Sequence, residues 1–302
     1  MQKPIQNWGS YKTSRGICIN EKCENVIENY LIPNYFNKIQ LIFTSPPFPL
    51  NRAKKYGNLS GENYKEWLCG VGNSLLPLLT DTGSIVIEIG NAWNPGEPTF
   101  STLPMETLLE FKNKCNLYLC QEFIYYNPAR LPSPIEWVNK SKIRVKDSFS
   151  RFWWLSRTPY PYACNTRVLE QYSKQMEKLL ANKKYNAGLR PSEHNISETS
   201  FLQDNGGAIP SNVIIAANTN SQNEYLKKCK ELNFAIHPAR MPTALPDFFI
   251  KMLSNEDDIV LDCFAGSNTT GYCAESLNRR WISIEANEEY YIGSKFRFTE
   301  AE

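Results

Sequence analysis

The chain of 302 residues is 42% hydrophobic, which is enough for one large α/β domain or for a core domain with a smaller insert. Its 33 Lys and Arg residues nearly balance its 31 Asp and Glu residues, so the net charge of +2 excludes a strongly basic protein and leaves any basic surface to local clustering. No apolar run reaches 18 residues and the first residues are polar, so neither a membrane segment nor a signal peptide is expected.

The cysteine and histidine content argues against a metal site. The nine cysteines are scattered without a Cys-x-x-Cys pair, and the chain has only two histidines, His194 and His237. Structural zinc sites need clustered ligands of these two types, so we expect no bound metal. Free thiols are typical of a reducing compartment, which favours a cytoplasmic protein.

The first elements lead to a strand that ends in a stiff loop. Residues 15–20 predict a turn and a short strand, and residues 21–31 predict a helix that Pro33 closes. Residues 39–43 are almost entirely apolar, and this run stops at the sequence Thr-Ser-Pro-Pro-Phe at positions 44–48. Two prolines cannot continue a sheet ladder, so the pattern predicts a buried strand at its carboxyl end, where open α/β sheets bind ligands.

The loop at positions 44–48 is rich in hydrogen-bond acceptors. Pro46 and Pro47 lack backbone N–H groups, so the hydroxyl of Ser45 and the carbonyls of Ser45 and Pro46 are left as acceptors, and Phe48 adds an aromatic face. This set suits an –NH2 group held beside a planar or cationic group. An ordinary proline-capped strand end explains the same residues equally well.

The segment after this loop is basic. Positions 51–58 contain three cations and a tyrosine, which suit contacts with phosphate groups, although a solvated loop is an equally open interpretation. The residues concerned are Arg52, Lys54, Lys55 and Tyr56.

A carboxylate interrupts the next predicted strand. Residues 64–79 have helical periodicity, residues 81–83 predict a turn, and residues 84–90 are typical of a buried strand that contains Glu88. A charge inside such a strand is unfavourable unless it is paired. Glu88 would lie beside Ser45 if the two strands are neighbours, or it would point into solvent at the strand end, and the pattern leaves both open.

The middle of the chain changes in composition. A helix over 105–113, a strand over 117–126, a proline-rich loop over 127–134 and an aromatic core strand over 150–156 are expected first. The sequence from 159 to about 232 is rich in Asn, Ser, Lys and Tyr and does not repeat the α/β pattern. It predicts an inserted small domain with a polar working face.

The α/β pattern resumes towards the end of the chain. Residues 247–253 predict a helix, residues 259–264 a strand, residues 265–271 a small-residue turn that opens another helix, and residues 281–285 a strand that ends in Glu285. This order is typical of nucleoside-binding βαβ units, in which the acid accepts ribose hydroxyls. The turn is neither Gly-x-Gly-x-x-Gly nor a phosphate loop, so a dinucleotide is not specifically indicated.

The two motifs together resemble a known family. The chain is similar to the beta group of amino-methylating DNA methyltransferases, in which the catalytic half precedes the target-recognition region and the cofactor half comes last. The resemblance spans nearly the whole chain, and Ser-Pro-Pro in place of Asp-Pro-Pro-Tyr points to the N4-cytosine branch, as in the PvuII-type modification methylases. It is carried by Ser45-Pro46-Pro47-Phe48 and by Asp262-Cys263-Phe264-Ala265-Gly266-Ser267-Asn268-Thr269-Thr270-Gly271, with further similarity at 54–58, 190–192, 204–210 and 237–240.

The resemblance implies S-adenosyl-L-methionine as cofactor, double-stranded DNA as partner and a role for particular residues. The implied catalytic residues are Ser45, Pro46, Pro47, Phe48 and Glu88. The implied cofactor-binding residues are Cys18, Thr44, His237, Pro238, Arg240, Thr243, Asp262, Phe264, Ala265, Gly266, Ser267, Asn268, Thr269, Thr270 and Glu285. The implied DNA-binding residues are Arg52, Lys54, Lys55, Tyr56, Arg190 and Ser192.

The implied architecture is a Rossmann-like, circularly permuted α/β methyltransferase sheet with an inserted recognition domain. Residues 1–158 would form the catalytic half of the methyltransferase domain, residues 159–235 the target-recognition region, and residues 236–302 the cofactor-binding half.

The implied reaction is methyl transfer to the N4 amino group of a flipped-out cytosine, within a restriction–modification system whose endonuclease acts separately. Ser45 and Pro46 would accept the two N–H bonds, Phe48 would stack on the base, and Glu88 would polarise Ser45 or take the proton. No Pro-Cys pair occurs, so ring-carbon methylation is not expected. An N6-adenine enzyme of this architecture, an inactive DNA-binding relative and a small-molecule methyltransferase remain alternatives.

Overall fold

The computed structural model divides the chain into a larger unit of residues 1–162 and 212–302 and a smaller unit of residues 163–211. The basic segment that contains Arg52, Lys54, Lys55 and Tyr56 lies outside the described residues. The described residues are 4–5, 7–49, 59, 61–183, 188–197, 201–218 and 224–298.

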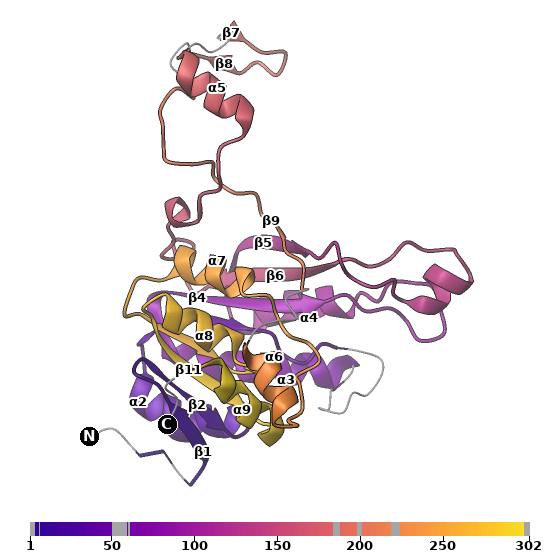
Figure 1. Ribbon diagram of the computed structural model, residues 1–302, viewed down its shortest axis with the longest axis vertical. Helices are drawn as coiled ribbons and strands as arrows, with labels where there is room; N and C mark the ends of the chain where they lie inside the picture. The colour runs from indigo at the N-terminus through magenta and orange to yellow at the C-terminus, as the bar shows by residue number, and fades with distance from the viewer. Residues whose placement is uncertain are drawn as a thin grey trace. The chain divides into compact units, whose positions relative to one another are not determined.

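One mixed sheet organises the larger unit (Figure 1). Within the described residues it has nine strands in the order β1-β2-β11-β10-β3-β4-β6-β5-β9. The five strands from β2 to β4 in this order run parallel, and β1 and β6 are antiparallel to the strands beside them. The bounds are β1 (Gly9–Lys12), β2 (Gly16–Asn20), β3 (Ile39–Thr44), β4 (Leu79–Gly90), β5 (Tyr118–Tyr126), β6 (Phe149–Ser156), β9 (Val213–Ile215), β10 (Ile259–Asp262) and β11 (Arg280–Glu285).

The strand order reverses between β10 and β3. These two strands are parallel neighbours, with Leu261 opposite Ile42. From β10 the chain continues to β11 on one side, and from β3 it continues to β4 on the other side. Open α/β sheets bind ligands at such a switch point, at the carboxyl ends of the strands. The predicted α/β fold is confirmed, and both predicted motifs end at this point of the sheet.

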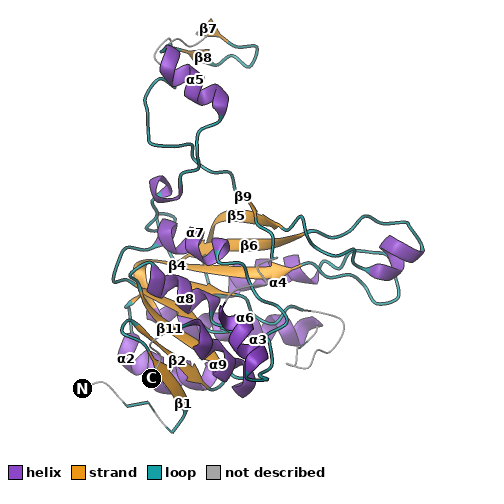
Figure 2. Ribbon diagram, in the orientation of Figure 1, coloured by secondary structure: helices purple, strands orange, loops and turns teal. Residues whose placement is uncertain are grey.

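Helices pack on both faces of the sheet. In Figure 1, α7 and α8 lie in front of the strands and α4 lies behind β4; α3 packs against α4. The side chains of β3 are all buried because both faces are covered. Figure 2 shows helices of the larger unit in purple. The α-helices described in this unit are α1 (Cys23–Val26), α2 (Ile32–Tyr35), α3 (Gly61–Leu75), α4 (Leu103–Lys114), α6 (Glu224–Glu231), α7 (Ala244–Leu253), α8 (Thr269–Ser276) and α9 (Glu288–Ser294).

Two local predictions in the first third of the chain are wrong. Pro33 does not close its helix, because a π turn over Ile27–Leu31 places the proline in the first turn of α2, where no backbone N–H donor is needed. The predicted turn at 81–83 lies inside β4 instead. Ile39 pairs with Leu79 but Leu41 pairs with Ser84, so the intervening residues form a bulge that keeps the strand in the sheet.

The smaller unit has little buried surface. It contains α5 (Lys174–Asn182), whose first turn is capped by Ser173, and a two-stranded sheet of β7 (Gly188–Leu189) and β8 (Asn195–Ile196). This unit comprises residues 163–211 and is therefore shorter than the region predicted at 159–235. Residues 213–215 form β9 in the large sheet, and α6 packs against the C-terminal part of the larger unit, so the segment from 212 onward belongs to that unit.

Candidate active site

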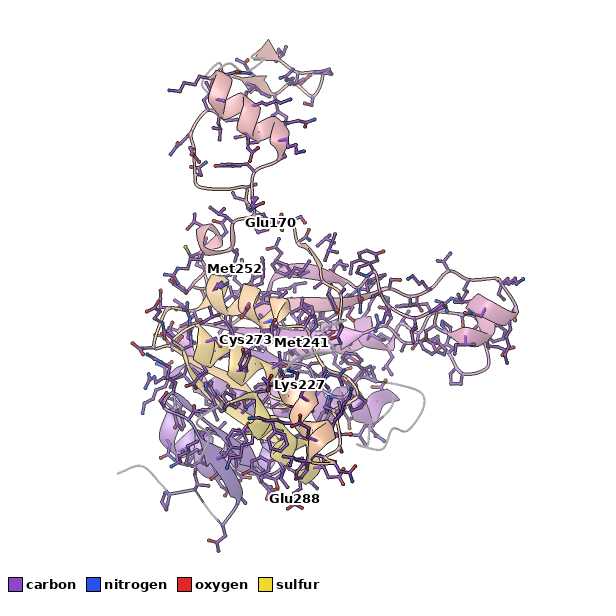
Figure 3. All side chains as sticks on the ribbon, viewed as in Figure 1. Glu170, Lys227, Met241, Met252, Cys273 and Glu288 are labelled. Atoms are coloured by element: carbon purple, nitrogen blue, oxygen red, sulfur yellow. The ribbon has the colours of Figure 1, made fainter. Side chains whose placement is uncertain are left out.

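A cavity of about 1580 Å³ opens at the carboxyl ends of β3, β4, β10 and β11. Its wall contains the loop after β3, the turn after β10 and the segment before α7, including Met241, which is labelled in Figure 3. Every lining residue belongs to the larger unit. The switch point of the sheet therefore holds the one place where the predicted catalytic and cofactor residues share a cavity in the described part of the chain.

Ser45 and Glu88 form a hydrogen-bonded pair on this wall. The Ser45 hydroxyl donates to Glu88 Oε2 over 2.9 Å, and the Glu88 residue is only 9% exposed. The pair forms because β3 and β4 are parallel neighbours, with Thr44 opposite Ile87. The solvent-facing alternative for Glu88 is thereby excluded. Since the serine proton points at the carboxylate, the lone pairs of Ser45 Oγ are available as acceptors.

Glu88 is held in a nearly dry environment. Burial raises the pKa of its carboxyl, and hydrogen bonds from Ser45 and Ser150 and the charge of Arg130 oppose that rise without cancelling it. Ser150 reaches Glu88 from β6, where it pairs with Gly90 on β4. A carboxylate with a raised pKa is a better base than a solvated one, so this position can accept a proton.

Phe48 lies over the end of β4 because Gly90 has no side chain. A Cβ atom built on Gly90 would approach the Phe48 ring to 2.5 Å, which is closer than any normal contact. The glycine therefore sets the position of the aromatic ring beside Ser45. No pattern in the sequence connects these two residues, because the contact depends on the register of β3 and β4.

Replacing Gly90 with alanine is expected to displace the Phe48 ring and to lower the free energy of unfolding by about 1–3 kcal/mol, as overpacking in a core does. Denaturant titration measures this. Gly70→Ala on α3 is the matched control, because a Cβ atom there meets nothing within 4 Å, and it should be neutral or stabilising. The contact between Gly90 and Phe48 would be contradicted if Gly90→Ala left the free energy of unfolding unchanged. It would also be contradicted if Gly90→Ala destabilised the Phe48→Ala variant as much as it destabilises the wild type.

Asp262 ties the two halves of the site together. Its carboxylate accepts hydrogen bonds from the hydroxyls of Thr44 (2.7 Å) and Thr270 (2.6 Å) and from the backbone N–H of Phe264 (3.1 Å). Burial raises the pKa of Asp262, and these three donors oppose the rise. The carboxylate thus joins the end of β3 to the turn after β10 and to α8.

Glu285 shapes the turn that follows β10. Its two carboxylate oxygens accept from the backbone N–H groups of Gly266 (2.7 Å) and Asn287 (2.8 Å). Each oxygen keeps a second lone pair, and the side chain lines the cavity, so it can also accept from a bound diol. Gly266 has a φ of +53°, and a Cβ atom there would lie 3.0 Å from the imidazole of His237, so this position favours glycine.

His237 is a neutral part of the wall. Burial lowers the pKa of its imidazole to about 4, and its ring packs edge-on against Tyr290 with 4.6 Å between ring centroids. At neutral pH the imidazole therefore adds no charge to the cavity.

Ten of the predicted cofactor residues reach the cavity wall and five do not. Cys18, Thr44 and Asn268 are sealed inside the protein, and Asn268 uses its side chain to cap α8 through the N–H of Gly271 (3.1 Å). Pro238 and Thr243 lie on the exposed surface. The residues on the wall are His237, Arg240, Asp262, Phe264, Ala265, Gly266, Ser267, Thr269, Thr270 and Glu285.

The structure adds wall residues that the sequence did not predict. Trp67 on α3 donates to Glu24 (2.7 Å) and packs 5.5 Å from the Phe264 ring, while Arg130 and Ser150 surround Glu88. Trp67 belongs to an amphipathic helix, so its periodicity signals only a core position. Arg190 and Ser192 belong to the smaller unit, in the turn between β7 and β8.

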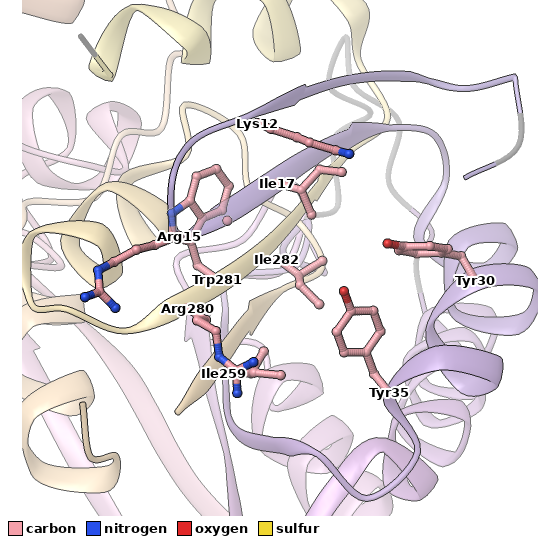
Figure 4. Close-up of a pocket in the computed structure, with 10 residues that line it drawn as sticks. Lys12, Arg15, Ile17, Tyr30, Tyr35, Ile259, Arg280, Trp281 and Ile282 are labelled. Carbon is pink, nitrogen blue, oxygen red and sulfur yellow. The ribbon is translucent and has the colours of Figure 1, made fainter. Parts of the chain in front are cut away.

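A second cavity of about 250 Å³ lies at the opposite, amino-terminal ends of β2, β10 and β11 (Figure 4). It includes Lys12, Arg15 and Arg280, but Arg15 is paired with Asp257 (2.7 Å). In the described ranges, no cluster of three or more His, Cys, Asp or Glu side chains could hold a metal ion. Among these same residues, no helix combines the length and apolar character of a membrane span.

Comparison with known proteins gives concordant results. Residues 39–295 match the family described as DNA methylase. The chain is 42% identical over 291 residues to the Type II methyltransferase M.PvuII of Proteus hauseri, which covers 96% of this chain and 85% of that protein. The fold resembles the solved PvuII DNA methyltransferase (cytosine-N4-specific) with a TM-score of 0.77 and 36% identity, over 96% of this chain and 88% of that one. It also resembles the M1.HpyAVI–SAM complex, with a TM-score of 0.57 and 18% identity over 94% of this chain and 98% of that one.

Proposed function

Because the chain belongs to the DNA methylase family, we propose that it is a site-specific DNA methyltransferase that transfers a methyl group from S-adenosyl-L-methionine to the N4 amino group of a cytosine. The observation that carries this proposal is the Ser45–Glu88 pair, which shares a cavity with Glu285 and Phe264. The similarity to an enzyme named as cytosine-N4-specific favours cytosine. A role in restriction–modification with a separate endonuclease, and a cytoplasmic location, are part of the proposal, and the similarity to a Type II methyltransferase supports them.

The cavity fits S-adenosylmethionine. Glu285 supplies two carboxylate oxygens for the ribose hydroxyls, Phe264 an aromatic wall, and the turn at Gly266 a close backbone approach that a side chain would block. The bound cofactor supplies a methyl group on a sulfonium centre. This assignment places the cofactor against the residues of the cavity wall. Direct cofactor contact is not assigned to the five predicted residues off the wall, which are Cys18, Thr44, Pro238, Thr243 and Asn268.

Ser45 and Pro46 activate the nucleophile. The lone pair of the cytosine amino nitrogen is delocalised into the ring, and accepting both N–H bonds at the Ser45 hydroxyl and the Pro46 carbonyl favours tetrahedral geometry at the nitrogen. Pro47 stiffens the loop, and Phe48 stacks on the base. Holding the base in this pose contributes much of the rate acceleration. The base must leave the duplex to reach the cavity, so base flipping is part of the proposal.

Glu88 removes the surplus proton. The Ser45 hydroxyl already donates to Glu88 over 2.9 Å, so it can pass its proton to the carboxylate while it takes one from the methylated nitrogen. The raised pKa of the buried carboxyl makes this transfer favourable.

Expression in a host without DNA methylation tests the proposal. Sequencing of the host DNA with detection of modified bases should show N4-methylcytosine at one short sequence. Unmodified DNA, or modification at adenine, would reject the proposed function.

Replacing Glu285 with alanine is expected to weaken S-adenosylmethionine binding by about 1.5–3 kcal/mol, which is roughly 10- to 100-fold, because hydrogen bonds to a charged group are lost. Isothermal calorimetry measures the affinity, and DNA binding should stay nearly unchanged. Glu289→Ala, at an exposed carboxylate on α9, is the control. Unchanged cofactor affinity in Glu285→Ala would remove this residue from the cofactor site.

The smaller unit is proposed to choose the DNA sequence. Its Asn, Arg and Ser side chains can donate to and accept from base edges, with Arg190 and Ser192 as candidates. The cations Arg52, Lys54 and Lys55 are proposed to contact phosphates, which supply affinity without sequence choice, and Tyr56 to accompany them.

Exchanging residues 163–211 for the matching unit of a related enzyme should change the methylated sequence and leave cofactor affinity as it was. The exchange is confined to this range because β9 and α6 belong to the larger unit. Modification mapping reads the result. An active chimaera that keeps the original site would contradict the proposal.

A further inference from the structure

The connection between β5 and β6 is a long arm that the proposed reaction leaves unexplained. It comprises residues 127–148 and extends beyond the two strands with a helical turn near its tip (Figure 2). Backbone hydrogen bonds join its two limbs, from Asn127 N to Ser148 O (2.9 Å) and from Asp147 N to Ser133 O (3.1 Å). The arm is therefore an ordered element with a defined surface.

The arm exposes apolar side chains and turns a cation inward. Leu131 and Val145 are 81% and 86% exposed. Lys146 Nζ instead donates to the carbonyl oxygens of Pro128 and Arg130, at 3.1 Å each, across the two limbs. Soluble proteins usually bury large apolar side chains and leave the charged ends of lysines in solvent. The hydrogen bonds of the arm itself thus hold its apolar side chains in solvent, as expected of a contact surface.

The arm is also basic, although the chain as a whole is nearly neutral. It has five cations against two carboxylates, a net charge of +3, whereas the whole chain carries +2, so all other residues together carry −1. Apolar side chains within a positive surface fit an anionic partner that also offers apolar faces. The cations are Arg130, Lys140, Lys142, Arg144 and Lys146, and the carboxylates are Glu136 and Asp147.

Part of the arm lines the cavity that holds the reacting groups. Arg130 and Ile135 line the same cavity as Ser45 and Glu88, and Ile135 is 62% exposed. A target base that enters this cavity would therefore lie in the same cavity as these side chains.

We propose that residues 127–148 form a wedge that stabilises the opened duplex beside the flipped base. The proposal rests on the proposed function, because a paired duplex shows mainly phosphates, sugars and base edges, whereas a duplex that has lost a base from its stack also shows apolar base faces. Leu131, Ile135 and Val145 contact those faces, as apolar wedges do in other DNA-bending proteins, and the exposed cations Lys140 and Lys142 face phosphates.

The test compares two duplexes that carry the methylated sequence found by modification mapping. One is fully paired, and the other has a mismatch at the target cytosine, so that flipping is already easy. The variant Leu131→Ser/Ile135→Ser/Val145→Ser should lower the single-turnover methylation rate by about tenfold on the paired duplex, because flipping becomes limiting, and should leave the mismatched duplex near the wild-type rate. The control Phe36→Ser/Leu109→Ser/Leu232→Ser removes three other exposed apolar side chains of the same unit and should change neither rate.

Three outcomes reject the wedge. The first is a triple variant that methylates both duplexes as fast as the wild type, and the second is a triple variant that is equally slow on both. The third is a wild-type dimer, seen in sedimentation, that the triple variant converts to a monomer while both rates stay unchanged. That result would make the arm a self-association surface. A wild-type chain that methylates neither duplex rejects the proposed function itself, whereas an active wild type with an unaffected variant rejects the wedge alone.

Discussion

Replacing Ser45 with alanine should lower the rate of methyl transfer by about 2–4 kcal/mol of barrier, or roughly 30- to 1,000-fold, as the loss of one positioned group does in closed sites. The hydroxyl is the acceptor that Glu88 orients over 2.9 Å, and among the described residues of the loop after β3 no other side chain bonds to Glu88. Cofactor affinity and the free energy of unfolding should change little.

Single-turnover kinetics with excess enzyme measures this effect without interference from product release. Ser45→Thr keeps a hydroxyl and should retain more activity than Ser45→Ala. Ser74→Ala removes an exposed serine of α3, far along the chain from the loop, and should act as wild type. A wild-type-like rate for Ser45→Ala would remove Ser45 from the mechanism.

Replacing Glu88 with glutamine should slow methyl transfer by about 10²- to 10⁴-fold, because the proton acceptor is lost. The same change should stabilise the fold. Burial raises the pKa of Glu88 in the folded state, so its ionised form favours the unfolded chain. That penalty is fully present above the folded-state pKa and disappears as the pH falls below the unfolded-state pKa. The melting temperature of Glu88→Gln should therefore exceed that of wild type at neutral pH and converge with it in acid.

The pH–rate profile provides the second arm of this test. The wild-type rate should fall as the pH drops through the raised pKa of Glu88, and the residual rate of Glu88→Gln should not follow that fall. Glu122→Gln, at a carboxylate on β5 that pairs with Arg151, is the control. Glu88 would be excluded as the base if the wild-type rate stayed constant as the pH fell to the usual pKa of a glutamate. A fully active Glu88→Gln variant would exclude it as well.

The strands around the site could be predicted because their signal is local. The apolar run at 39–43 and the βαβ pattern at 259–285 each specify a buried strand, and prolines or small residues mark where each strand stops. The rule that open α/β sheets bind ligands at the carboxyl ends of their strands places both motifs at the same edge of the sheet, whereas the pairing of β3 with β10 is seen only in the structure.

Other parts of the site depend on contacts between distant segments, and the sequence alone does not contain them. Ser150 reaches Glu88 only because β6 pairs with β4, and Phe48 lies over Gly90 only because of the register of β3 and β4. The turn after β10 likewise directs Asn268 inward as a helix cap, although its position in the motif suggests a ligand contact. Similarly, the composition that marks an insert continues past residue 211, whereas β9 returns to the large sheet.

Mass spectrometry of nucleosides measures methyl transfer to the cytosine N4 atom most directly. DNA is incubated with the purified protein and S-adenosylmethionine that carries an isotopically labelled methyl group, and is then digested to nucleosides. We expect labelled N4-methyldeoxycytidine, formed by the wild type and strongly reduced with Ser45→Ala. Labelled N6-methyldeoxyadenosine or 5-methyldeoxycytidine as the product would contradict it.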